Sequence, residues 1–211
     1  MATTTTNYGW DIPQSTDLVK DGATAIATLG QDIDTSIYTA LGTKKAGMVL
    51  LNTTSFSGVS SQILSLSGSY ESYRIIISHT GTTADSSALL RLSLNGTPAT
   101  GANYNYAFTG LIATSGASNN QYGNGDTKFQ YGTNETASTT EFAGFVFDLI
   151  DVNVARNTHI TSIGMSVNSA GSSTSWTGAG LHEVSTAYNQ VQFYSSTGNF
   201  SGRASVYGYN F

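Results

Sequence analysis

The sequence predicts a mainly β protein, an antiparallel jelly-roll-like β-sandwich preceded by a short N-terminal helix. Two patterns lead to this fold class. After residue 46, segments rich in β-branched and aromatic residues alternate with clusters of Gly, Asn and Ser, whereas before it apolar residues recur at helical spacing. The length of 211 residues gives room for one domain of ordinary size and a short appendage. We therefore divide the chain into an N-terminal segment, residues 1–46, and a β-module, residues 47–211.

The composition argues against several classes of protein. Charged residues make up 10% of the chain, with 8 Lys and Arg against 13 Asp and Glu, so we expect no nucleic-acid partner. The absence of Cys excludes disulfides and thiolate metal sites. No apolar run approaches the roughly 18 residues of a membrane span, so we expect no membrane insertion. The start MATTTTNYGW lacks the pattern of a signal peptide.

The N-terminal segment begins with a polar stretch. Residues 1–9 are rich in Thr and predict an extended or disordered tail. Trp10 carries a large apolar surface with no local burial in the pattern, and two interpretations stay open. Its ring either docks on a partner chain or packs back on its own domain.

Residues 15–41 predict a helix, with Ser15 or Thr16 as the N-cap and no proline inside. Apolar or small residues step by three and four along it, which is the spacing of a heptad seam. Two glycines weaken the isolated helix by about 1 kcal/mol each, so it needs a packing partner. That partner is either the chain's own domain or copies of the same helix in a parallel bundle. The seam residues are Val19, Gly22, Ile26, Leu29, Ile33, Ile37 and Leu41.

The pattern of the β-module predicts short strands, each with one apolar face. Phe145, Phe147 and Leu149 share one face of their strand, and Leu90, Leu92 and Leu94 share one face of theirs. Ile163, Met165 and Val167 likewise oppose Ser162, Gly164 and Ser166, and we expect the apolar set to be buried. Such strands fit two stacked antiparallel sheets. The predicted strands are 48–56, 59–66, 73–79, 88–95, 104–113, 127–131, 140–149, 159–167, 174–182, 191–194 and 204–209.

No pattern predicts catalysis, a metal site or a cofactor. His79, His159 and His182 lie far apart at strand ends, where we expect them to be exposed. Asp148 and Asp151 flank a strand end and are the candidate carboxylate pair of a glycosidase, yet both also suit a solvated strand terminus. The polar stretch 119–135 predicts a loop without the alternating oxygen ligands of a calcium site.

Aromatic residues in polar surroundings favour surface recognition. An aromatic face beside amide and hydroxyl groups stacks on a sugar ring and binds its hydroxyls, so we predict a glycan-binding surface. The alternative for each ring is that it closes an edge of the sandwich. The candidate residues are Tyr104, Tyr106, Tyr122 and Trp176.

Three stretches resemble virion proteins of tailed bacteriophages. Residues 7–37, NYGWDIPQSTDLVKDGATAIATLGQDIDTSI, resemble the N-terminal segment of tail-fibre proteins, in which Gly-Trp-x-Ile-Pro precedes a DLVKDGA-x-AI-x-x-LG motif. Residues 191–211, VQFYSSTGNFSGRASVYGYNF, are similar to the closing hairpin of β-sandwich modules in phage fibres. Residues 70–96 are similar to the early strands of those modules.

The resemblance implies a virion structural protein, a short tail fibre or spike at the particle surface, assembled in the host cytoplasm. It implies a homotrimer held by the helix through Val19, Ile26, Leu29, Ile33 and Ile37. Trp10, Ile12 and Pro13 would then dock on other virion proteins of the tail or capsid, and the β-module would face a host surface glycan.

The chain is shorter than typical tail fibres, because its single module follows the helix almost at once. A capsid decoration, a head fibre or a connector without receptor binding is therefore the alternative. A glycan-active enzyme or a free carbohydrate-binding module is the alternative from another class.

Overall fold

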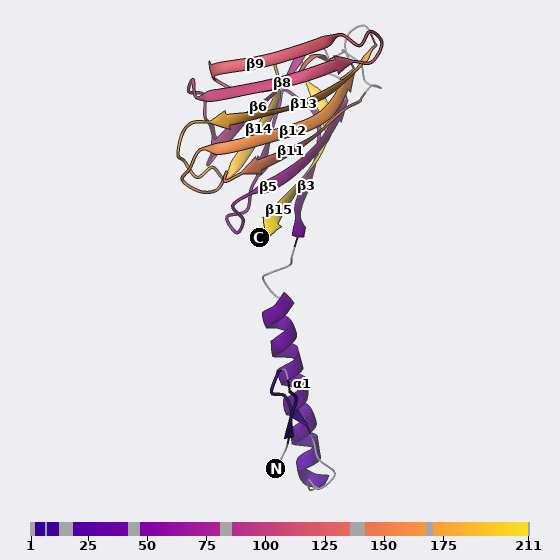
Figure 1. Ribbon diagram of the computed structural model, residues 1–211, viewed down its shortest axis with the longest axis vertical. Helices are drawn as coiled ribbons and strands as arrows, with labels where there is room; N and C mark the ends of the chain where they lie inside the picture. The colour runs from indigo at the N-terminus through magenta and orange to yellow at the C-terminus, as the bar shows by residue number, and fades with distance from the viewer. Residues whose placement is uncertain are drawn as a thin grey trace. The chain divides into compact units, whose positions relative to one another are not determined.

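The computed structural model describes residues 3–6, 8–12, 19–41, 47–80, 86–135, 142–167 and 171–210 (Figure 1). The chain divides into two compact units. One comprises Met1–Gly47 with Asn210–Phe211, and the other comprises Met48–Tyr209.

The N-terminal unit pairs a small hairpin with a helix. Strands β1 (Thr3–Thr4) and β2 (Asp11–Ile12) are antiparallel, and Gly9 turns the chain between them with a φ of 68°. Of the two states predicted for this tail, extended or disordered, Thr3 and Thr4 adopt the extended one, as strand β1. Helix α1 (Val19–Leu41) confirms the helical pattern, whereas the predicted caps Ser15 and Thr16 lie outside the described residues. No helix among the described residues has the length and apolarity that a membrane span requires.

Within the described residues, the β-module contains an eight-stranded and a five-stranded sheet, and the strand pairs whose register is described are antiparallel. This arrangement confirms the mainly β sandwich with jelly-roll-like architecture. The large sheet follows the order β3 (Gly47–Val59), β15 (Phe200–Asn210), β5 (Tyr73–Thr80), β11 (Phe142–Ile150), β12 (Thr158–Val167), β13 (Ser173–His182), β8 (Tyr104–Ile112) and β9 (Ser118–Asp126). The small sheet follows the order β10 (Phe129–Glu135), β6 (Ser86–Leu94), β14 (Gln190–Ser195) and β4 (Ser61–Ser65), with β7 (Thr97–Pro98) paired to β6.

Strand β9 corrects the sequence interpretation, which predicts a loop and no strand at residues 119–126. Its sequence SNNQYGNGD contains one aromatic residue and no aliphatic one. It nevertheless forms a strand because the neighbouring strand β8 supplies backbone partners from Tyr104 to Leu111.

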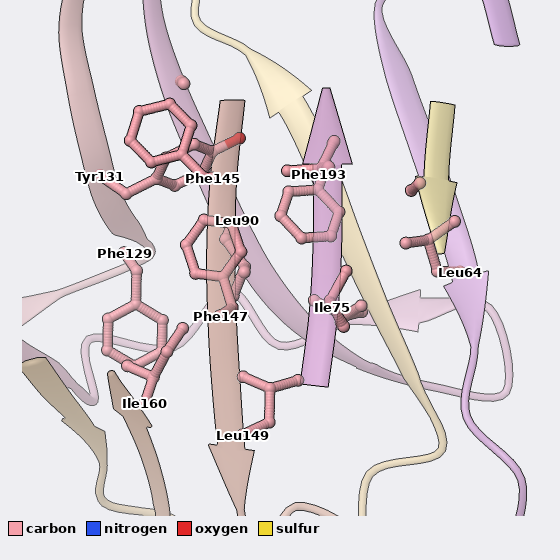
Figure 2. Packing of buried hydrophobic residues seen from close by; sticks show 14 of the residues in the cluster. Leu64, Ile75, Leu90, Phe129, Tyr131, Phe145, Phe147, Leu149, Ile160 and Phe193 are labelled. Carbon is pink, nitrogen blue, oxygen red and sulfur yellow. The ribbon is translucent and has the colours of Figure 1, made fainter. Parts of the chain in front are cut away.

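The core lies between the two sheets and is rich in aromatic rings (Figure 2). Phe145 and Phe147 of β11 meet the ring of Tyr131 from β10 edge-on, with centroids 4.8 and 4.7 Å apart. The ring centroid of Phe193, from β14, lies 5.4 Å from that of Phe147. Edge-to-face pairs of this kind add about 0.5–1.5 kcal/mol to the burial of the rings themselves.

From Ser162 to Ser166, strand β12 buries the face opposite to the one that the alternation pattern predicts. Ser162 and Ser166 point inward and are buried, whereas Ile163 and Met165 are 64% and 48% exposed, so the expected burial of the apolar set is wrong for these two.

Large rings from the neighbouring strands occupy the inner space beside β12. Phe145 and Trp176 are the cross-strand neighbours of Gly164, and a Cβ at that glycine would lie 2.2 Å from Cδ1 of Phe145. The indole N–H of Trp176 donates to Oγ of Ser166 at 2.9 Å. Glycine and serine are therefore the residues that fit inside from Ser162 to Ser166.

Candidate functional site

The outer face of the large sheet carries an open hollow of about 480 Å³, here called the sheet hollow. Strands β5, β11, β12 and β13 bring its lining together from positions more than 100 residues apart in the sequence. Its size falls within the range of small-ligand sites, about 300–1,000 Å³. The lining residues are Arg74, Val146, Asp148, Thr161, Ser162, Ile163, Thr177 and Gly178.

An ion pair forms the polar end of the sheet hollow. Arg74 and Asp148 are register partners on β5 and β11. Nε and Nη2 of Arg74 donate to the two carboxylate oxygens of Asp148 at 2.8 and 2.7 Å, and the hydroxyl of Tyr209 donates to the same carboxylate. The hydrogen bond from Arg74 lowers the pKa of Asp148, so the carboxylate is ionised at neutral pH. Both side chains of the pair stay partly exposed.

Two kinds of group surround this ion pair. Thr161 and Thr177 are exposed and offer hydroxyls on the outer face, at diagonal positions of the adjacent strands β12 and β13. Val146 and Ile163 are register partners that offer apolar surface beside them. The hollow thus combines fixed charges, hydroxyls and aliphatic groups on a rigid sheet.

One register line, here called the cross-strand row, leads from the sheet hollow to the edge of the sheet. Each residue in it is the direct partner of the next, so all lie on the outer face. Ala179 and Ala107 are exposed and small, and Tyr122 ends the row with 82% of its surface exposed. The row consists of Arg74, Asp148, Thr161, Ala179, Ala107 and Tyr122.

The structure divides the four aromatic residues predicted to bind glycan. Tyr104, Tyr106 and Trp176 are buried members of the core. The hydroxyl of Tyr104 donates to the carbonyl of Ala99 at 2.9 Å and accepts the N–H of Leu92 at 3.1 Å. A buried ring has no face to offer a ligand, so the prediction is corrected for these three residues. Tyr122 is the one of the four whose ring is exposed.

The predicted carboxylate pair is divided between two arginines. Asp148 binds Arg74, whereas Asp151, in a turn with a φ of 59°, lies 3.5 Å from Nη1 of Arg156. Sequence reasoning missed Arg74 and Tyr209, because only the pairing of β5, β11 and β15 brings them to Asp148.

The described residues hold no group of three or more His, Asp or Glu side chains suited to a metal ion. In the stretch 119–135, Asp126 accepts Nζ of Lys128 at 2.9 Å and the hydroxyl of Tyr106 at 3.0 Å. His159 is exposed as predicted, but His79 and His182 are buried, so the expectation of exposure is wrong for these two.

Helix α1 exposes part of its apolar stripe, here called the helix seam and defined as Ile26, Leu29, Ile33 and Ile37. Ile26 and Ile37 are 65% and 52% exposed, whereas Leu29 and Ile33 are half-buried. Val19 and Leu41 extend the stripe in sequence. The structure does not show trimerisation.

The hairpin covers a neighbouring flank of α1. The indole N–H of Trp10 donates to Oγ of Ser36 at 2.9 Å, and the ring of Tyr8 stacks on that of Trp10 with centroids 5.1 Å apart. Of the two open interpretations, the structure shows Trp10 packed on its own chain. Ile12 is 37% exposed, and Pro13 lies outside the described residues.

No protein-family model and no curated protein matches the chain. Among solved structures, the galectin LEC-6 of Caenorhabditis elegans is similar with a TM-score of 0.38 and 10% identity, covering 75% of this chain and 96% of the galectin. An exo-inulinase from Aspergillus awamori is similar with a TM-score of 0.36 and 10% identity, covering 77% of this chain and 28% of the inulinase. Both scores are low, and neither similarity indicates what this chain binds.

Proposed function

We propose that this chain is a bacteriophage virion structural protein, a short tail fibre or spike that trimerises through α1 and projects the β-sandwich toward the host. The observation that carries the proposal is the exposed helix seam. Ile26 and Ile37 present apolar surface to water at heptad spacing. In water such a stripe is stable when copies of the helix share it, because burial of apolar surface contributes about 25 cal/mol per Å².

The position of the hairpin supports this choice of partner. The hairpin contacts the flank of α1 that includes Ser36 and leaves Ile26 and Ile37 exposed. The chain's own N-terminal segment therefore contacts the helix and leaves the Ile26 and Ile37 part of the seam exposed. The resemblance of residues 7–37 to tail-fibre segments supports a virion fibre as the assembly and a trimer as its oligomeric state.

The sheet hollow does not favour the enzyme alternative. Asp148 is the carboxylate among its lining residues, and its pKa is lowered by the hydrogen bond from Arg74. A glycosidase needs a carboxylic acid with a raised pKa and a second carboxylate about 5–10 Å away. We therefore propose no enzymatic activity for this site.

The oligomeric state tests the proposal. We expect the full chain to sediment as a trimer at micromolar concentration. The double variant Ile26→Asp/Ile37→Asp should sediment as a monomer, because charges cannot be buried along the seam without partners. The matched control is Thr24→Asp/Thr35→Asp, which places the same charges at the same spacing on an exposed face of α1 and should stay trimeric.

A monomeric wild-type chain, or a seam variant that remains trimeric, would refute trimerisation through α1. A second experiment addresses the particle. Gold-labelled antibodies against the purified chain should mark the tail in electron micrographs of the phage. Labelling of the capsid instead would favour the alternative of a head fibre or decoration protein.

A further inference from the structure

We infer that the outer face of the large sheet binds an extended, uncharged glycan, which lies along the cross-strand row from Arg74 and Asp148 to Tyr122. The inference deepens the proposed function, because it assigns a ligand class and a binding face to the projecting module. It is argued from the residues of this face alone and does not depend on the oligomeric state.

The chemistry of the sheet hollow matches a sugar. A sugar ring presents hydroxyls at its rim and C–H groups on its faces, so it needs hydrogen-bonding groups in fixed positions next to apolar surface. Arg74 and Asp148 provide the former, and Ile163 with Val146 provides the latter. The two-fold hydrogen bonding between Arg74 and Asp148 and the contact from Tyr209 hold the carboxylate before a ligand arrives. Groups that are already ordered lose little entropy on binding.

The ion pair also determines the charge of the ligand. Arg74 and Asp148 are the charged residues of the hollow lining, and each neutralises the other. An acidic sugar would place its carboxylate beside Asp148 and would have to displace that group from Arg74. The hydroxyls of an uncharged sugar accept hydrogen bonds from the remaining N–H groups of Arg74 and donate to the carboxylate of Asp148, and the ion pair stays intact. The hollow therefore favours neutral saccharides.

The cross-strand row determines the length of the ligand. Asp148 on β11 and Tyr122 on β9 are four strand spacings apart, which corresponds to about 19 Å at 4.8 Å per spacing. The strands between them lie side by side (Figure 1). Ala179 and Ala107 have small side chains, so no bulky group stands between the two ends of the row. The exposed ring of Tyr122 offers a stacking surface at the far end. A glycan of several units is the ligand that contacts both ends.

Saturation-transfer NMR with the full chain tests the inference. The probes are neutral hexasaccharides of glucose, galactose, mannose, rhamnose and N-acetylglucosamine, with a hexamer of galacturonic acid as the acidic comparison. We expect transfer to at least one neutral probe, and weaker transfer to the acidic one at equal concentration. Binding of the neutral probe should change little between 50 and 300 mM salt, because no net charge is paired on binding.

Two variants locate the site. Thr177→Trp fills the sheet hollow from an exposed strand position that tolerates an aromatic residue, and should weaken binding at least about tenfold. Tyr122→Ala removes the stacking surface and should raise the Kd about threefold to tenfold. The matched control is Ser65→Trp, which places the same side chain on an exposed position of β4 in the small sheet and should leave binding unchanged.

Absence of transfer to every neutral probe overturns the inference, as does tighter binding of the acidic hexamer. Neutral binding that survives Thr177→Trp also overturns it, since the ligand would then lie elsewhere. These outcomes are distinguishable from failure of the proposed function. A trimeric chain that binds no glycan removes the ligand assignment and leaves the fibre, whereas a monomer that binds through Thr177 and Tyr122 removes the fibre and leaves the ligand assignment.

Discussion

His182 is expected to make the β-sandwich lose stability in mild acid. Its ring is fully buried at the end of β13, between Tyr104 at 4.3 Å and Tyr188 at 5.2 Å. Neither ring nitrogen has a hydrogen-bond partner among the described residues. Burial without any charged partner lowers the pKa of His182 to about 4 from its ordinary value of 6.5. The imidazole is therefore neutral in the folded protein throughout the pH range in which it titrates in the unfolded chain.

The sign and size of the effect follow from these two pKa values. Below pH 6.5 the unfolded chain takes up a proton at His182 and the folded chain does not, so the free energy of unfolding falls as the pH falls. The loss is complete near pH 4 and amounts to about 3 kcal/mol for a difference of about 2.5 pH units. Between pH 7.5 and pH 5.0 it is about 2 kcal/mol.

The variant His182→Leu removes this contribution and keeps an apolar side chain of similar volume. Urea unfolding followed by circular dichroism at pH 7.5 and 5.0, at one chain concentration, gives the free energy of unfolding of each protein. We expect the variant to lose about 2 kcal/mol less than the wild type between these two pH values. At pH 7.5 it should be at least as stable as the wild type, since no hydrogen bond is removed.

His159→Leu is the matched control, because His159 lies exposed on the neighbouring strand. This control should show the pH dependence of the wild type. If His182→Leu loses as much stability as the wild type on acidification, the buried ring is not the source of the effect and the reasoning is refuted.

Two substitutions test the packing of the core. Gly164→Ala should destabilise the protein by about 1–3 kcal/mol in urea unfolding, because its Cβ would lie 2.2 Å from the ring of Phe145 and 2.5 Å from the carbonyl of Gly144. Gly144→Ala is its control and should be near neutral, since no atom lies within 4 Å of that Cβ; equal losses would contradict the packing argument. Tyr104→Phe should cost about 1–3 kcal/mol, because it leaves the N–H of Leu92 and the carbonyl of Ala99 without the hydroxyl. An unchanged midpoint for Tyr104→Phe would contradict the structural role of that hydroxyl.

The fold class could be predicted from the sequence because its two periodicities are strong. The steps of three and four from Val19 to Leu41 match a helix and no strand, and α1 spans these residues. In β11, Phe145, Phe147 and Leu149 share one face and all three are buried, whereas Val146 and Asp148 between them are half-buried. Burial of apolar surface dominates the choice of structure in both segments, so the spacing of apolar residues along the chain predicts it.

The prediction failed where backbone pairing or the space inside the sandwich determines the structure. Strand β9 contains no aliphatic residue, so no hydrophobic pattern identifies it, and its place is set by pairing with β8. Strand β1 of the N-terminal hairpin likewise has no hydrophobic pattern, because it consists of Thr3 and Thr4. A strand of this kind depends on its partner more than on its own side chains.

Three of the four aromatic residues predicted to bind glycan are buried, and their sequence context explains the error. Polar residues surround Tyr104, Tyr106 and Trp176 in the sequence, and that context favours an exposed ring. In the folded chain the neighbours that count are those across the sheet, and several of them are glycines. Trp176 has Gly164 on one side and Gly110 on the other, so the inner face has room for the indole. A glycine-rich strand in this protein is therefore a sign of a buried ring on the next strand.

The same packing creates the candidate binding face. Because Phe145 and Trp176 take the inner volume beside the second half of β12, the strand places glycine and serine inside from Ser162 to Ser166, and Ile163 and Met165 point outward. Ile163 thereby joins Arg74 and Asp148 on the outer face, although the three residues come from three strands and no sequence motif links them. The apolar part of the sheet hollow is thus a consequence of the size of the rings in the core. Substitutions that shrink Phe145 would free inner space for β12, and they would act on the binding face as well as on stability.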